Sequence, residues 1–260
     1  MTPISVRSKP IRQLRSLFRR FRNAVKAFRN NEIGYHLSIG RFGNFDVAYR
    51  QGTTDEEVIS HSFEKDMFFT SITDYAPEPH HIILDVGAHI GTFSLLAASK
   101  VTKGMVYAVE ANKESFNYLR INLVLNKCHN VTANHLALSD RKGETTLYYR
   151  DVNSGHSIMT KTSHGEQVPT DTLSDYFSMN GIEHCHFVKF NCEGAEFPIL
   201  LSAPAEVLSH IDNMLILYHC DLAMGYNYKD LEKHLQNCGF KTKTLNQEDD
   251  RGWIVARQMK

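Results

Sequence analysis

From residue 81 onward, short apolar runs alternate with segments in which apolar residues recur every three or four positions. Short apolar runs predict buried strands, and the longer spacing predicts helices that bury one face. The expected strands are residues 82–86, 105–109, 131–138, 187–190 and 214–218, and the expected helices are residues 91–99, 115–125, 172–179, 197–208 and 228–237. This alternation predicts a mostly parallel α/β sheet with helices on both faces.

The end of the chain changes the pattern. Residues 240–245 and 252–256 predict two strands with no helix between them, hence a hairpin that adds one antiparallel strand. The expected sheet therefore has seven strands in a Rossmann-like arrangement. Residues 145–149 predict a further hairpin arm, followed by a polar loop, and Pro204 is expected to break the helix at 197–208.

Two stripes of side chains run through residues 11–30. An apolar stripe and a basic stripe each repeat at spacings of three and four, and the basic one follows one residue later, about 100° around a helix. This pattern predicts a basic amphipathic helix. Residues 36–39 and 44–49 then predict short strands, and Asp55 is expected to cap a helix that runs to about residue 71.

Pro77 and Pro79 mark a linker before the alternating part of the chain. We therefore expect three segments. They are the basic helix at 1–30, an extension at 31–80 that contributes to the substrate side, and the main domain at 81–260.

Charge is distributed unevenly, although the formal net charge is zero. Nine of the 29 basic side chains lie in residues 1–30, which hold no acidic one, so residues 31–260 carry 20 basic and 29 acidic side chains. A cationic helix with three phenylalanines fits a peripheral contact with an anionic membrane. It fits equally well packing on the acidic body or on a second copy in an oligomer. Nucleic acid is a less favoured partner, and an organelle transit peptide is a further alternative.

The five cysteines form no C-x-x-C pair, which is typical of a reduced, intracellular protein. The first residues lack the continuous apolar segment of a secretory signal, and no run of about 18 apolar residues could span a bilayer. The expected location is cytoplasmic, with membrane association through residues 11–30 left open.

The most informative chemistry lies where the first strand of the main domain ends. Asp85, Gly87, His89 and Gly91 form a turn between that strand and the next helix, a place where Rossmann-like folds bind nucleotides. The spacing is G-x-x-x-G and not the G-x-G-x-x-G of dinucleotide sites, which favours S-adenosylmethionine over NAD. Glu110 ends the second strand, 19 positions after Gly91, where an acid would accept hydrogen bonds from ribose hydroxyls.

Two more clusters follow strand ends. Residues 137–140 close the third strand, where Ala137, Leu138 and Asp140 are expected to surround the adenine ring.

The other cluster follows the strand at 187–190. Asn191 and Glu193 are expected near the transferred methyl group, while Glu196 is interpreted mainly as a helix-capping acid. His219 ends the following strand and, with a near-neutral pKa, is a candidate general base beside Glu193.

These motifs resemble those of FkbM-type methyltransferases. The resemblance rests on residues 85–91, Glu110, 137–140 and 189–196, together with an R-x-G-T-x-D segment at 50–55. It implies the seven-stranded sheet of class I methyltransferases and S-adenosylmethionine as cofactor. The implied reaction is commonly methylation of a hydroxyl on a sugar, a glycan or a polyketide-like product, so a small-molecule or glycan acceptor is the expected partner.

The chain departs from the family pattern at two places. Asn191 stands where K-x-D-x-E-G-x-E has Asp, and Tyr218 precedes His219 where the family often has an acid. Both departures weaken a carboxylate-base or metal-assisted scheme. They keep open a cofactor-binding protein with weak or no turnover, and a nucleic-acid methyltransferase recruited by the basic N-terminus is a third reading.

Fourteen histidines raise the question of a metal site. His184, Cys185 and His186 are ligand types, but neighbouring side chains of a strand point to opposite faces, and no zinc-finger spacing occurs. We therefore expect no metal.

Overall fold

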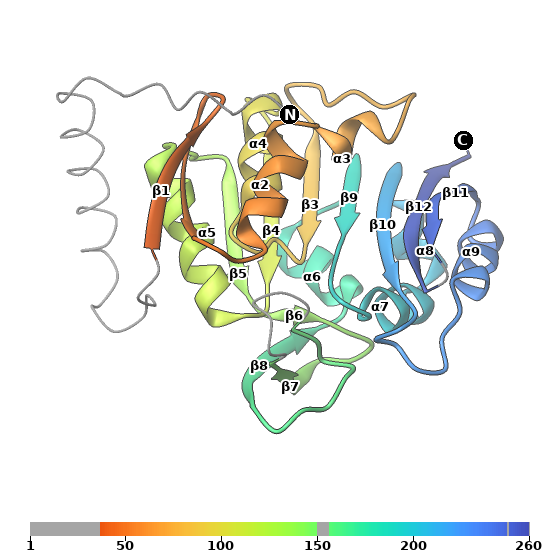
Figure 1. The fold of residues 1–260 in the computed structure, drawn as a ribbon. Helices are drawn as coiled ribbons and strands as arrows, with labels where there is room; N and C mark the ends of the chain where they lie inside the picture. Colours follow the sequence, from red (N-terminus) through yellow and green to blue (C-terminus); the bar gives the residue numbers. More distant parts are fainter. Residues whose placement is uncertain (1–36, 150–155, 249, 260) are drawn as a thin grey trace, which may run out of the picture.

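The computed structural model describes residues 37–149, 156–248 and 250–259 (Figure 1). The helix expected at 11–30 lies outside these residues. A seven-stranded sheet forms the centre, in the order β11-β12-β10-β9-β3-β4-β5. Its strands are β3 (Ile82–Val86), β4 (Met105–Glu110), β5 (Val131–His135), β9 (Phe187–Phe190), β10 (Asn213–His219), β11 (Phe240–Glu248) and β12 (Arg251–Gln258). Only β12 pairs antiparallel with its neighbours, so the expected terminal hairpin is confirmed.

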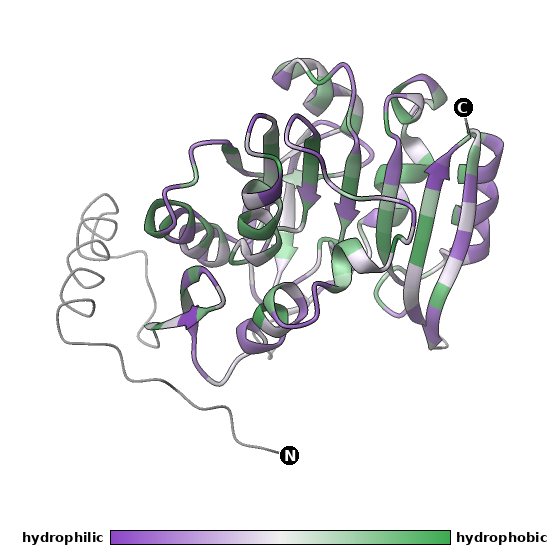
Figure 2. Cartoon of the chain, turned by 90° about the horizontal axis from the view of Figure 1, so that it is seen from above, coloured by the Kyte–Doolittle hydropathy of each residue, from purple (hydrophilic) through white to green (hydrophobic). Residues whose placement is uncertain are grey.

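Alternate residues of the central strands serve two different cores. Leu84 and Val188 belong to a cluster with α6 (Leu173–Asn180), α7 (Glu196–Ser202), α8 (Ala205–Ser209) and α9 (Tyr228–Asn237). Ile83 and Phe187, one residue away, pack against Phe93 of α4 (Thr92–Lys100). Because successive strand residues face opposite sides, the apolar runs bury both faces of the sheet. Figure 2 shows the central strands largely green and purple gathered on outer helices.

The extension before the sheet packs on the same side as α5 (Lys113–Leu125). Its strands β1 (Leu37–Phe42) and β2 (Phe45–Arg50) form a hairpin, close to the expected positions. Side-chain amides of α5 hydrogen-bond to this hairpin. For example, Asn122 Oδ1 accepts a hydrogen bond from the Ala48 N–H at 2.7 Å. No helix among the described residues is long and apolar enough to cross a membrane.

The structure corrects two predictions about the extension and confirms one about a later helix. The helix expected at 55–71 is two helices, α2 (Asp55–Phe63) and α3 (Met67–Thr70), because Asp66 adopts a left-handed φ of 44°. Asp55 is not its cap: Thr54 holds that position, and Asp55 is buried against Arg50. The helix expected at 197–208 is broken at Pro204, as predicted, into α7 and α8.

A second, three-stranded sheet lies beside the carboxyl ends of the main strands (Figure 1). The strand expected at 131–138 divides between the two sheets, since its last part is β6 (Ala137–Leu138). This pairs with β8 (Gly165–Asp171), which in turn pairs with β7 (Gly143–Tyr148). The prediction of a loop at β8 was wrong, because its polar residues and Pro169 conceal an alternation in which Val168 and Thr170 are buried.

Candidate active site

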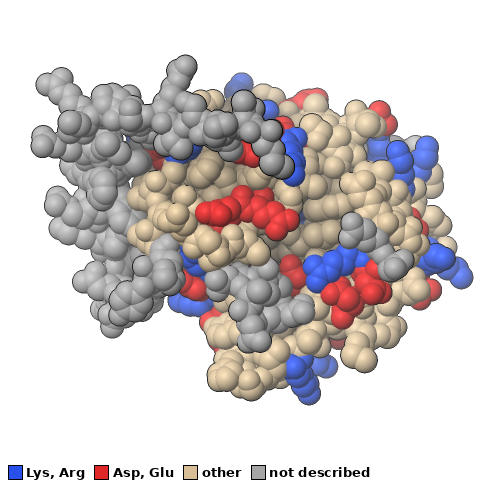
Figure 3. Space-filling model, in the orientation of Figure 1, with Lys and Arg blue, Asp and Glu red and all other residues tan. Residues whose placement is uncertain are grey.

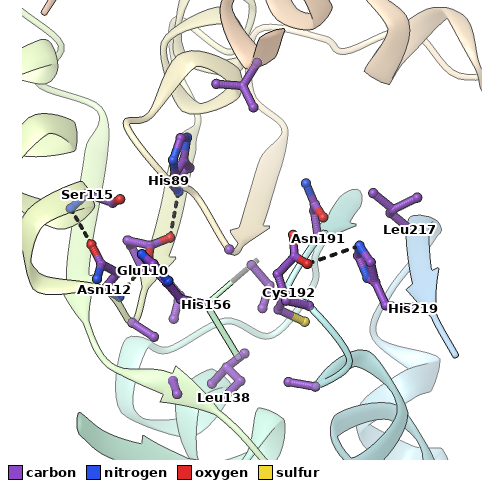
Figure 4. Close-up of a pocket in the computed structure, with 18 of the residues that line it drawn as sticks. His89, Glu110, Asn112, Ser115, Leu138, His156, Asn191, Cys192, Leu217 and His219 are labelled. Carbon is purple, nitrogen blue, oxygen red and sulfur yellow. Dashed lines mark hydrogen bonds and ion pairs between the residues drawn. The ribbon is translucent and has the colours of Figure 1, made fainter. Parts of the chain in front are cut away.

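A cavity of about 390 Å³ lies at the carboxyl ends of β3, β4, β9 and β10. Open α/β sheets bind ligands at this edge. In Figure 4, His89 and Glu110 lie on one side of the cavity, and Asn191 and His219 on the other. Eight of the eleven predicted site residues line it: Gly87, His89, Glu110, Ala137, Leu138, Asn191, Glu193 and His219.

The glycine turn is shaped by close packing. Gly87 has a φ of 75°, and a Cβ there would lie 1.9 Å from the carbonyl oxygen of Asn191. Gly91, with a φ of 84°, is the N-cap of α4, and a Cβ there would lie 2.3 Å from Leu119. Gly91 does not line the cavity. The two glycines therefore let the turn press against β9 and α5, which brings both sides of the cavity together.

Asp85 also lies outside the cavity lining. Its carboxylate is fully buried and accepts hydrogen bonds from Lys189 Nζ at 2.8 Å and Ser94 Oγ at 2.7 Å. The same ammonium donates to the Gly87 carbonyl at 2.8 Å. Asp85 thus positions Lys189, and Lys189 hydrogen-bonds to the turn. Asp85 therefore supports the shape of the site without contacting a ligand in the cavity. The prediction omitted Lys189, although it is part of the 189–196 motif.

Glu110 presents its carboxylate to the cavity from the end of β4. One oxygen accepts the His89 N–H at 2.7 Å, and the other accepts the Asn112 N–H at 2.8 Å. Burial raises the pKa of Glu110, although both backbone donors oppose this. Each carboxylate oxygen has a second lone pair, so the group can still accept hydrogen bonds from a pair of hydroxyls.

Apolar side chains surround the next part of the cavity. They are Leu136, Ala137, Leu138, Leu147 and Ile158. This composition suits a flat aromatic ring. Asp140 is exposed and does not line the cavity, so the structure does not place it where it was expected.

His219 is held between two glutamates. Its Nδ1 lies 3.1 Å from Glu196 Oε1, which also accepts the His219 N–H at 2.7 Å. Its Nε2 lies 3.6 Å from Glu193 Oε2. Burial alone would lower the pKa of His219, but the carboxylates of Glu196 and Glu193 raise it. Glu196 is fully buried and does not serve mainly as a helix cap, which corrects the interpretation from sequence.

The loop that carries Glu193 is strained. Glu193 has a φ of 54°, in the left-handed region, and Gly194 follows with a φ of 99°. The Ser157 hydroxyl donates to the Glu193 carbonyl, and Glu196 Oε2 accepts the Gly194 N–H at 3.1 Å. Such backbone strain persists only where the surroundings hold it. Here they aim a carboxylate into the cavity.

The cavity fits S-adenosylmethionine in its polar and apolar parts. Three buried polar atoms of its lining have no hydrogen-bond partner among the described residues: His89 Nδ1, Asn191 Oδ1 and Glu193 Oε2. Unpartnered buried atoms of this kind are costly in a folded protein. Together with the Glu110 carboxylate and the apolar wall, these atoms offer a polar ligand hydrogen-bonding groups beside an apolar surface.

Two clusters of possible metal ligands lie at the opposite edge of the sheet. They comprise His80, His81 and His186, and His184, His186 and Asp212. His184 and His186 are two residues apart, so their side chains lie on the same side and converge, whereas the expectation of no metal considered only adjacent residues. However, His186 Nδ1 accepts the Ile82 N–H and His81 Nδ1 accepts the Glu78 N–H. Each ring then carries its proton on Nε2, which opposes coordination through that atom.

Comparison with known proteins agrees with this geometry. The family model described as "Methyltransferase FkbM domain" matches residues 85–242, more than half of the chain. The comparison with curated proteins finds no match.

Solved structures resemble the fold at low sequence identity. Methyltransferase FkbM from Methylobacillus flagellatus KT has a TM-score of 0.53 and 9% identity, with 94% of this chain and 60% of that chain covered. Trm5b from Pyrococcus abyssi has a TM-score of 0.46 and 15% identity, covering 85% and 55%. M. jannaschii TYW2 in complex with AdoMet has a TM-score of 0.43 and 16% identity, covering 87% and 88%. This chain thus spans little more than half the length of the first two proteins.

Proposed function

The chain belongs to the FkbM methyltransferase family, whose cofactor is S-adenosylmethionine, and on that premise we propose that it methylates a hydroxyl group of a sugar, a glycan or a related small molecule. When bound, the cofactor supplies a methyl group on a positively charged sulfur, which is open to in-line attack. The protein then has two tasks: to align the acceptor, and to remove the proton of its hydroxyl.

The observation that carries this proposal is the position of His219. A carboxylate at Nδ1 selects the tautomer in which Nε2 has the lone pair, and Nε2 is then the basic atom on the cavity side. A sulfur or aromatic-carbon acceptor would have less need of such a base. A hydroxyl needs it, because its own pKa is far above neutrality.

Glu193 is the partner of His219 in this scheme. Its Oε2 lies 3.6 Å from the imidazole, which leaves the two groups able to share the proton taken from the acceptor. Asn191 contributes an unpartnered amide oxygen that can orient the acceptor hydroxyl. Because an amide cannot take up the proton, Asn191 is assigned a positioning role and the base is His219 with Glu193.

The remaining residues divide the cavity into two halves. Glu110 would accept hydrogen bonds from the ribose hydroxyls, and Ala137 and Leu138 would pack against the adenine ring. The acceptor half has aromatic and polar walls, from Glu57, His61, Phe68, Arg251 and Trp253. An aromatic face bordered by charged groups suits a polyhydroxylated ring. The C–H groups of such a ring can pack on the aromatic face, and its hydroxyls can hydrogen-bond to the charged groups.

The test is a panel of acceptors with S-adenosylmethionine, in which the demethylated cofactor is quantified. Sugars, sugar nucleotides, glycans and RNA are compared for wild type and for His219→Gln. We expect turnover on a hydroxylated small molecule or glycan, and a loss of about 10²-fold or more in the variant, as for removal of a general base. Turnover on RNA alone would contradict the proposal.

A matched variant separates an enzyme from a protein that only binds the cofactor. Asn191→Asp restores the acid of the family pattern. If the wild type binds the cofactor without turnover and this variant gains it, the enzyme proposal fails. If the wild type turns over and the substitution changes the rate without creating it, the proposal holds.

A further inference from the structure

Arg50, at the end of β2, is 4% exposed although it is charged. Its Nε donates to Asp55 Oδ2 at 3.0 Å, and one terminal nitrogen donates to Asp55 Oδ1 at 2.8 Å. The Arg50 backbone N–H donates to the same carboxylate at 2.7 Å. This bidentate pair joins the two ends of the R-x-G-T-x-D segment, which precedes the residues matched by the family model.

The guanidinium also reaches the two segments that hold Glu110. A terminal nitrogen lies 3.1 Å from His89 Nε2 in the glycine turn and 3.1 Å from Ser115 Oγ at the start of α5. The other terminal nitrogen lies 3.2 Å from Glu114 Oε2. Arg50 therefore bridges, from behind, the same two segments whose backbone N–H groups fix the Glu110 carboxylate.

The contact with Arg50 favours one tautomer of His89. A guanidinium can only donate, so Nε2 accepts and Nδ1 carries the proton. Asp55 Oδ1 lies 3.3 Å from the same nitrogen and would favour the opposite tautomer, but the Arg50 contact is shorter. Burial lowers the pKa of His89 to about 4, against the charge of Asp55 and with the charge of Arg50 acting in the same direction, so the ring is neutral at physiological pH.

The tautomer has a consequence for the cavity. His89 Nδ1, the protonated nitrogen, is buried without a partner among the described residues. A buried donor left without a partner is costly, and a hydrogen-bond acceptor on a bound ligand would remove that cost. At the same time, the His89 backbone N–H holds Glu110 Oε2, so the position of this one residue affects two groups of the cofactor half.

We propose that Arg50 and Asp55 are positioning residues for S-adenosylmethionine: the pair fixes the tautomer and place of His89, and through His89 the carboxylate of Glu110. The proposal rests on the proposed methyltransferase function but not on the nature of the acceptor. It gives the segment before the family match a direct part in cofactor binding.

The experiment measures the affinity for S-adenosylmethionine and its demethylated product by calorimetry, in the full chain. The variants are Arg50→Lys, which keeps the charge but cannot span the four partners of the guanidinium, and Asp55→Asn. The matched control is Arg41→Lys, since Arg41 pairs with Asp46 at 3.1 Å in the same hairpin without contact to the turn. We expect a loss of about tenfold or more for each Arg50 and Asp55 variant, and an unchanged dissociation constant for the control.

A second readout separates positioning from folding. In ¹⁵N-labelled protein, the imidazole nitrogens of His89 should report Nδ1–H in the wild type and a mixture of tautomers in Arg50→Lys, measured on samples whose circular dichroism shows that they are folded. Moreover, Arg50→Lys should cost little further affinity in a His89→Ala background, because the two residues act in series.

Three results would overturn the proposal. One is an unchanged affinity in folded Arg50→Lys and Asp55→Asn; another is an Nε2–H tautomer in the wild type; the third is full additivity with His89→Ala. If the wild type itself does not bind S-adenosylmethionine, the function fails and not merely the positioning role. Binding without turnover leaves the positioning proposal supported and refutes only the acceptor chemistry.

Discussion

At the residue scale, the two carboxylates beside His219 have different environments. Glu196 is fully buried and has four hydrogen-bond contacts, whereas Glu193 has a partly exposed side chain and faces the cavity. We therefore assign orientation of the ring to Glu196 and proton sharing to Glu193. A sequence pattern cannot make this distinction, because both residues follow the same strand and both suit a helix N-terminus.

The first prediction concerns the pH dependence of turnover. The base must be neutral, so the rate rises with pH through the pKa of His219, which the neighbouring carboxylates raise. Glu196→Gln removes one of those charges. The rising limb of kcat should then move to lower pH, while the maximal kcat falls by about tenfold or more because the ring is held less well. Glu193→Gln is the comparison. An unchanged limb in Glu196→Gln would contradict the assignment.

At the element scale, one buried ion pair joins the two central strands. Asp85 of β3 and Lys189 of β9 are 0% and 3% exposed and lie in register on neighbouring strands. Removing one partner of such a pair leaves an uncompensated charge. Lys189→Met should therefore lower the free energy of unfolding by about 3–5 kcal/mol in urea denaturation.

A surface pair provides the control for that measurement. Arg257 and Asp74 lie 3.2 Å apart, with side chains 53% and 74% exposed. Arg257→Met should cost less than about 1 kcal/mol. Similar losses for both substitutions would show that the Asp85–Lys189 pair has no special role in joining the strands.

The starts of β3 and β9 carry a titratable cluster. The rings of His81 and His186 stack at 4.1 Å, and His186 Nδ1 accepts the Ile82 N–H at 3.0 Å. Burial, with the neighbouring His81 and His184, lowers the pKa of His186 to about 4. Only the neutral ring can accept the hydrogen bond.

The third prediction follows from the direction of this pKa shift. The unfolded chain gains a proton at His186 near pH 6.5 and the folded chain only near pH 4, so the free energy of unfolding falls as the pH decreases between these values. His186→Asn keeps an acceptor but does not titrate. It should flatten the dependence measured by urea denaturation between pH 7 and pH 4.5, whereas His129→Asn, at an exposed position, should not. A slope unaffected by His186→Asn would refute the linkage.

The helices and strands were predictable from the sequence where an apolar pattern ends at a glycine or an acidic residue. β3, α4, β4 and α5 combine apolar runs with glycine or acidic termini, and their predicted bounds lie within two residues of those observed. β8 was not predictable in this way, since its pairing with β6 and β7 gives order to a polar segment. Likewise, Arg50 meets His89 and Ser115 only through tertiary packing. The R-x-G-T-x-D spacing was the signal, but it did not indicate the partners.

At the scale of the whole molecule, the sheet and the extension before it both line the cavity. The sheet supplies Glu110 and His219, whereas α2 and α3 of the extension supply Glu57 and Phe68. Acidic side chains gather over the region of α2 on the face shown in Figure 3, and Glu56 and Glu57 of that helix are exposed. The three partners expected from the sequence for the basic residues 1–30, namely this acidic body, a second copy and a membrane, stay predictions.

The most direct measurement is calorimetric titration of S-adenosylmethionine into the wild type and into Glu110→Gln. The substitution keeps the size of the side chain but replaces one of the two carboxylate oxygens, which we propose accept hydrogen bonds from the ribose hydroxyls, with an NH2 donor. We expect saturable binding to the wild type, a dissociation constant raised about tenfold or more in Glu110→Gln, and no binding of NAD. Equal affinity of the two proteins for S-adenosylmethionine, or binding of NAD in its place, would contradict this expectation.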